Sequence, residues 1–140
     1  MTESPTYGRS AADPFTIRVV VGPEHIDQMR HVNNVVYVQW VLQAAVSHWE
    51  TVAPAATRAE LAWAARRHEI DYLLPAFLGD ELTVVTWIGG AEGLTFERFA
   101  EVRFPDGRVA AKSRTLWVPI DPRSGRPKRV SAEVRGLFSV

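Results

Sequence analysis

The chain has 140 residues, of which 46% are hydrophobic and 23% charged, so it is long enough for one globular domain with a sizeable core. Its 16 Lys and Arg balance its 16 Asp and Glu, which gives no general electrostatic case for nucleic acid or an anionic membrane surface as a partner. The absence of cysteine excludes disulfides and thiolate catalysis. No apolar run approaches the roughly 20 residues of a membrane span, and the polar start lacks a hydrophobic signal core, so we predict a cytoplasmic protein.

The first third of the chain divides into a tail, a strand and a loop. Residues 1–13 are small and polar and predict a flexible tail, which leaves residues 14–140 as a single domain. β-Branched residues predict a strand from Phe15 to Val21, and Gly22-Pro23 ends it. Residues 23–33 hold no clear period and are expected to form a loop.

A long helix is predicted from residue 34 to about residue 51. Asn33 or Asn34 is a suitable N-cap, because its short side chain can accept a hydrogen bond from an early helical N–H. The β-branched residues would also permit a strand, but the length of the segment and its cap favour a helix. Apolar residues fall on nearly every face, which is typical of a helix that other structure surrounds.

The remaining chain is expected to be mostly β-structure. Residues 53–61 form a connection, with a helical turn near residues 57–61. Four strands follow, joined by turns that include Gly89 to Gly93 and Pro105-Asp106-Gly107, and Ser131 precedes a short terminal helix. The four strands are predicted at residues 68–74, 81–88, 94–104 and 109–120. Short turns between strands indicate an antiparallel sheet, so we predict an α+β fold in which about five strands wrap around the long helix.

Four residues beside the start of the long helix suggest a site. Asp27, His31, Asn33 and Asn34 place a carboxylate, hydrogen-bonding side chains and the positive end of a helix dipole at the edge of the core. This combination suits acyl chemistry. The alternative is that Asp27 forms a turn or a cap and that His31 is a hydrogen-bonded structural residue.

The order of elements resembles the hotdog fold, a curled antiparallel sheet around a long central helix. The stretch Asp27-Gln-Met-Arg-His-Val-Asn-Asn-Val-Val-Tyr37 resembles the acyl-CoA thioesterases related to 4-hydroxybenzoyl-CoA thioesterase, which carry an Asp, then Gly-His-Val-Asn-Asn, then a Tyr. Further similar stretches are Glu69–Leu82, Gly107–Ala111 and Thr115–Asp121. The resemblance runs from about residue 15 to residue 138.

This resemblance implies a thioesterase that hydrolyses an acyl-CoA or acyl-carrier-protein thioester, with Asp27 as nucleophile or general base and the helix start as oxyanion stabiliser. It implies no cofactor besides the coenzyme A of the substrate, and a homodimer or homotetramer with sites at the interface. Residues matched to substrate binding are Arg30, His31, Val32, Asn33, Asn34 and Tyr37. Two positions depart from the family pattern: Arg30 replaces a Gly, and Gln43 replaces a Glu.

Other interpretations remain open. The same fold could serve an enoyl-thioester hydratase or dehydratase that uses Asp27 and His31, or a non-catalytic acyl-CoA-binding module in which Arg30 blocks the attack path. The four histidines show no metal-ligand spacing, so no metal site is expected. Basic residues available for coenzyme A phosphates are Arg66, Arg67, Lys112, Arg114, Arg126, Lys128 and Arg129.

Overall fold

The computed structural model describes Gly8, residues 10–138 and Val140. The chain begins with β1 (Phe15–Val20), followed by a 3-10 turn and two helices, α1 (Asn34–Val52) and α2 (Ala55–Glu60). Four strands and a last helix follow: β2 (Ala62–Tyr72), β3 (Glu81–Glu92), β4 (Thr95–Arg103), β5 (Val109–Ile120) and α3 (Ala132–Leu137). This order confirms the predicted succession of a strand, a long helix and four further strands.

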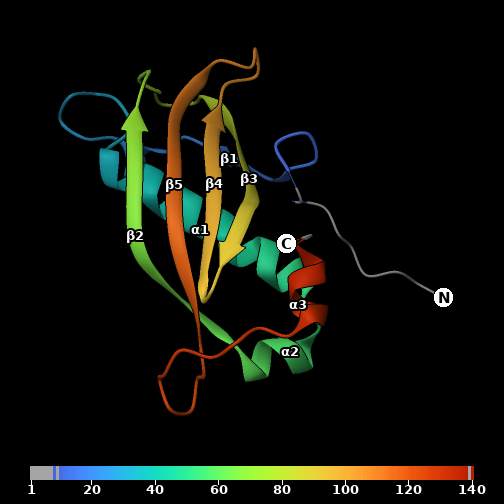
Figure 1. Cartoon of the computed structure of the whole chain (residues 1–140). Coiled ribbons are helices and arrows are strands. Elements are labelled where there is room, and N and C mark those ends of the chain that lie inside the picture. Colours follow the sequence, from blue (N-terminus) through green and yellow to red (C-terminus); the bar gives the residue numbers. More distant parts are fainter. Residues whose placement is uncertain (1–7, 9, 139) are drawn as a thin grey trace.

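The five strands form one antiparallel sheet in the order β1-β3-β4-β5-β2, so that β1 and β2 are the two edges. Figure 1 shows α1 crossing one face of this curled sheet, with α2 and α3 near the far end of the helix. The α+β class and the five-stranded arrangement around a long helix are therefore as predicted. None of the helices in the described part of the chain is long and apolar enough to span a membrane.

Helix α1 begins at Asn34, next to one of the two asparagines that we predicted as its N-cap. The Asn33 side chain accepts a hydrogen bond from the N–H of Val35 at 3.0 Å, so Asn33, and not Asn34, is the N-cap. The side that faces the sheet carries the buried residues of the helix, including Tyr37, Trp40 and Ala44. A second stripe is open in the single chain, although apolar residues occupy nearly every face in the sequence. Its residues are Val35, Gln39, Gln43, Val46 and Glu50.

The core consists of two clusters, one toward each end of α1. The first includes Tyr37 and Trp40 with Leu82, Val84 and Val102, and it supports the beginning of the helix. The second joins Val52, Ile88, Phe96 and Phe138, with several tryptophans packed against it. The two ends of the helix therefore lie in different surroundings, one mainly aliphatic and one mainly aromatic.

Two strands, β2 and β3, differ from their predicted bounds by more than two residues. Strand β3 continues through Gly89 and Gly90, where we expected a turn, and its register with β4 shifts between Ile88 and Gly90. A Cβ on Gly89 would lie 2.3 Å from the Phe99 ring, so this glycine serves close packing rather than a turn. Strand β2 begins at Ala62 rather than at residue 68. Its first residues include several alanines, which carry little β-propensity, and pairing with the long β5 extends the strand.

The predicted flexible tail falls partly outside the described residues, which do not include 1–7 and 9. Within the described part, the N–H of Gly8 donates to the carbonyl of Asp13 at 2.8 Å, and Ser10 forms a β-bridge with Asp13. A turn therefore precedes β1 directly. The boundary between a tail and a single domain of residues 14–140 stays a prediction.

Candidate active site

A tight loop connects the 3-10 turn to α1 and carries the predicted catalytic residue. Ile26 and Val32 form an antiparallel bridge that closes the loop. Inside it, the N–H of Asp27 donates to the carbonyl of His31 at 3.1 Å, and the N–H of Arg30 donates to the carbonyl of Asp27 at 3.0 Å. These bonds fix the backbone of Asp27 at the base of the loop that leads into α1.

The Asp27 side chain is half-buried, and only one of its two carboxylate oxygens accepts a hydrogen bond from the described residues. Its Oδ1 accepts a hydrogen bond from the N–H of Met29 at 2.8 Å, which is the turn-forming role that we considered as the alternative to catalysis. No hydrogen bond from the described residues reaches its Oδ2. The turn therefore orients the carboxylate and leaves one oxygen available.

The first turn of α1 offers a hydrogen-bond donor. The cap uses the N–H of Val35, and the N–H of Val36 donates to the carbonyl of Asn33 at 2.9 Å. The N–H of Asn34 has no such partner in the described part of the chain. The dipole of a 19-residue helix stands behind it, so this N–H can stabilise negative charge on an acceptor oxygen.

A cleft of about 150 Å³ opens beside this helix start. It is lined by His31, Val32, Asn34, Tyr37, Tyr72, Leu73, Leu74 and Pro75. Four of the predicted substrate-binding residues therefore come together, whereas Asp27, Arg30 and Asn33 do not line this cleft in the single chain. The segment after β2 was not predicted to take part. The sequence signal available was the pair of leucines directly before Pro75, Leu73 and Leu74, which the structure leaves 50% and 37% exposed.

Tyr37 lines this cleft and carries a buried hydroxyl. Its side chain is buried, and its hydroxyl has no hydrogen-bond partner among the described residues. Burial raises the pKa of Tyr37, so the group remains a protonated O–H donor at neutral pH. The neighbouring Tyr72 donates its hydroxyl to the carbonyl of Asn34 at 3.2 Å, which ties the end of β2 to the helix start.

The remaining predicted residues have less distinctive surroundings. Nδ1 of the half-buried His31 lies 3.2 Å from the carbonyl of Val32, which agrees with a structural role for the ring. Arg30 is exposed and has a φ of 65°, in the left-handed region that favours glycine. Among the described residues there is no group of three or more His, Cys, Asp or Glu side chains that could hold a metal ion.

Comparison with known proteins agrees with this geometry. The family model of the thioesterase-like superfamily matches residues 21–138. A thioesterase from Thermus thermophilus, solved with coenzyme A and zinc, is 27% identical, with a TM-score of 0.77 over 88% of this chain and 90% of that one. No significant relative is found among curated protein sequences.

Two more distant structures show the same fold. The probable thioesterase YbaW of Escherichia coli is 24% identical and has a TM-score of 0.78, covering 88% of this chain and 95% of its own. Slr0204 of Synechocystis, a 1,4-dihydroxy-2-naphthoyl-CoA thioesterase, is 19% identical and has a TM-score of 0.77. The match covers 90% of this chain and 96% of that one.

The match to the family model, on a chain with the hotdog fold, identifies the class of protein as a thioester hydrolase. Because the family model matches most of its length, the chain belongs to the thioesterase-like superfamily.

Proposed function

We propose that this protein hydrolyses an acyl-CoA thioester, with Asp27 as nucleophile or general base. The observation that carries the proposal is that the loop leading into α1 holds the Asp27 carboxylate by one oxygen only, while the helix start that it precedes lines a cleft with Asn34, whose N–H has no partner among the described residues. The Thermus relative was solved with coenzyme A, which supports the same class of substrate here. An acyl-carrier-protein thioester is the substrate variant to compare with it.

The reaction adds water across the carbon–sulfur bond and yields a carboxylic acid and a thiol. Negative charge develops on the carbonyl oxygen, and we assign its stabilisation to the N–H of Asn34 with the helix dipole behind it. The hydroxyl of Tyr37, which lines the same cleft, is a second donor. That charge develops in one of two ways. Asp27 Oδ2 attacks the carbonyl carbon and expels the thiolate, which forms an anhydride that water then hydrolyses, or Oδ2 takes a proton from a water molecule that attacks the carbonyl carbon and expels the thiolate. The thiolate is a good leaving group, so the proposal needs no strong acid and no cofactor.

Replacement of Asp27 tests the proposal. With a panel of short, long and aromatic acyl-CoAs, Asp27→Asn is expected to lower thiol release by about a hundredfold or more, because positioned acid–base groups contribute on that scale. In a single turnover in ¹⁸O-labelled water, label in the Asp27 carboxylate would identify the nucleophilic route.

Asp106→Asn is the matched control. Asp106 also accepts a backbone N–H from the residue two positions on, that of Arg108 at 2.9 Å, but it lies in the β4–β5 hairpin. This variant is expected to keep full turnover. Full turnover in a folded Asp27→Asn variant would reject the assignment. Loss of enoyl-CoA absorbance without thiol release would favour the hydratase, and coenzyme A binding without turnover would favour a binding module.

We also propose that the active form is a homodimer, with tetramers as a possible larger assembly, and that it works in the cytoplasm. The outer edge of β2 and the open stripe of α1 are the surfaces that a second copy would cover. In the single chain Asp27 does not line the cleft at the start of α1, so we propose that a second copy completes the site around it. An unpaired edge of 11 residues is also one that proteins usually cover.

A further inference from the structure

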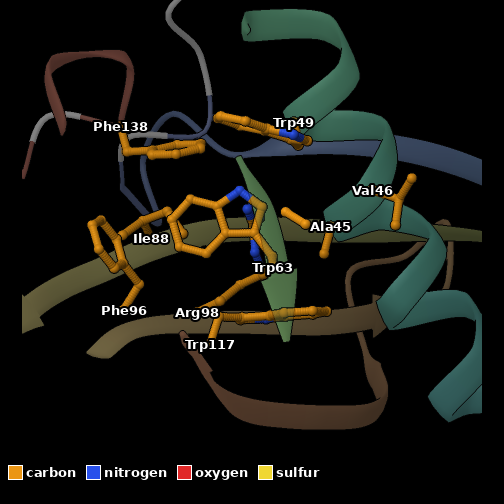
Figure 2. A pocket seen from close by; sticks show the side chains of 10 residues that line it. Ala45, Val46, Trp49, Trp63, Ile88, Phe96, Arg98, Trp117 and Phe138 are labelled. Carbon is orange, nitrogen blue, oxygen red and sulfur yellow. The ribbon is translucent and has the colours of Figure 1, made fainter. Parts of the chain in front are cut away.

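A second cavity lies at the other end of α1, among the aromatic residues of the second core cluster. It has a volume of about 160 Å³. Figure 2 shows its ring-bearing side chains around the opening, with Arg98 reaching in from β4. The rings are those of Trp49, Trp63, Phe96, Trp117 and Phe138. From Asn34 to Ala45, the first helical residue that lines it, the helix rises by about 16 Å at 1.5 Å per residue. Within one chain this cavity is therefore separate from the cleft at the start of α1.

Arg98 is the unusual member of this cavity. The side chain is only 7% exposed, and its guanidinium donates to His48 Nδ1 and to Thr86 Oγ1, both at 3.0 Å. Both of these acceptors are uncharged, and no carboxylate in the described part of the chain pairs with it. Burial lowers the pKa of the Arg98 guanidinium to about 9, so the group is still protonated at neutral pH. A buried cation without an anion is costly, and such a group is satisfied when an anion binds.

Two residues that line the cavity carry further donors. The indole N–H groups of Trp63 and Trp117 are buried and find no acceptor among the described residues. Buried polar groups are normally hydrogen-bonded, so three donor side chains on one apolar cavity indicate an oxygen-bearing ligand. If these side chains only filled the core, we would expect residues without unsatisfied donors at their positions.

The size and shape of the cavity limit the apolar part of the ligand. An engineered apolar cavity of about 150 Å³ holds one benzene molecule, so a volume of about 160 Å³ accommodates one ring or a chain of similar size. Aromatic walls favour a flat group that packs against their faces. A guanidinium matches the two oxygens of a carboxylate better than it matches a single neutral acceptor.

We propose that this cavity is a second binding site, which takes a carboxylate carried on a single aromatic ring or on a flat unsaturated group of similar size. Arg98 binds the carboxylate, the indole N–H groups of Trp63 and Trp117 donate to its oxygens, and the surrounding rings pack on the apolar part. The ligand is either a free carboxylic acid or the distal end of an acyl group. The site does not depend on the proposed hydrolysis.

Titration of the full-length protein with benzoate and with neutral benzyl alcohol tests the site. Calorimetry or tryptophan fluorescence should show saturable binding of benzoate and about tenfold or weaker binding of benzyl alcohol, because a hydrogen bond to a charged group contributes on that scale. Arg98→Met should remove this preference. Asp27→Asn should keep it, which separates the second site from the hydrolytic one. Equal affinity for both probes, no binding of either, or a preference that survives Arg98→Met would overturn the proposal.

Two additional measurements complete the test. Arg98→Met should melt at no lower temperature than the wild type, since it replaces a buried unpaired cation by an apolar side chain of similar length. If that variant fails to fold, Trp63→Phe serves instead, and it should weaken benzoate more than benzyl alcohol. Hydrolysis of 4-carboxybenzoyl-CoA and benzoyl-CoA then identifies the source of the ligand. If the wild type prefers the carboxylated thioester and Arg98→Met removes that preference, the ligand is the distal end of an acyl group. If Arg98→Met changes the hydrolysis of both thioesters equally, the ligand is a free acid.

Discussion

At the residue scale, the loop that holds Asp27 contains an arginine in a conformation that glycine prefers. Arg30 follows a turn closed by its own N–H and the Asp27 carbonyl, and it adopts a φ of 65°. A turn followed by one left-handed residue is a common short connection, usually with glycine at that position. The Gly of the family pattern that Arg30 replaces would therefore suit the backbone conformation found here.

Arg30→Gly is expected to stabilise the protein by up to about 1 kcal/mol, because the cost of a side chain in the left-handed region exceeds the entropy that glycine gains in the unfolded chain. Urea denaturation measures the change. Met29→Gly is the matched control: Met29 is the preceding exposed residue, and its φ is not positive. It should be neutral or destabilising because glycine gains entropy in the unfolded chain. Equal effects of the two substitutions would show that the left-handed conformation of Arg30 carries no strain.

Single residues were predictable from the sequence where local chemistry decides their role. The Asn33 cap is an example, because its hydrogen bond joins neighbours in the chain. Arg98 was missed, although strict alternation along β4 places it on the same inward face as Phe96 and Ala100. The charge of an arginine favours an exposed position, whereas the two-residue period of the strand places Arg98 on the buried face. The strand period decides its position. The free side of the Asp27 carboxylate depends on the loop geometry, which the sequence does not specify.

At the scale of elements, the strands were predictable in number and order but not at their ends. Strand β2 extends toward α2 because Ala62 and Trp63 pair with Ile120 and Pro119 of β5. Such pairing joins residues that lie far apart in the sequence, so no local sequence pattern predicts it. Gly89 likewise is explained only by the Phe99 ring that covers it from the neighbouring strand.

The pairing of β2 with β5 also predicts a loss of stability in acid. Nδ1 of His68 on β2 lies 2.6 Å from Thr115 Oγ1 on β5, and its buried Nε2 has no partner in the described residues. Burial lowers the pKa of His68 below its usual 6.5. The folded state thus disfavours the protonated ring, so this contribution is present above pH 6.5 and is lost as the pH falls toward the lowered pKa.

Denaturant unfolding of the wild type and of His68→Gln between pH 7.5 and pH 5 tests this sign. The glutamine can keep a polar contact with Thr115 but does not titrate. The wild type should lose more stability than the variant over this interval. The prediction is wrong if both proteins lose the same amount, because His68 would then contribute nothing to the pH dependence.

At the scale of the whole molecule, the single chain leaves its central helix partly open. Val35 is 60% exposed on α1, on a stripe that also carries Val46 at 51% exposure. Among the strands of the described residues, the neighbouring sheet edge, β2, pairs only with β5. Exposed apolar residues next to an unpaired edge are the features that a second copy of the chain would bury. The sequence showed an apolar helix but not which of its faces the sheet leaves uncovered.

This arrangement predicts a dimer that depends on Val35. Light scattering of the purified protein should give twice the mass of the chain, and Val35→Lys should shift the equilibrium toward the monomer, because a charge would be buried at the interface without a partner. Val20→Lys is the matched control, since Val20 is also 60% exposed but lies on β1, at the opposite edge of the sheet. That variant should remain dimeric. A wild-type protein that stays monomeric at all concentrations would rule out the interface, and equal dissociation of both variants would place it elsewhere.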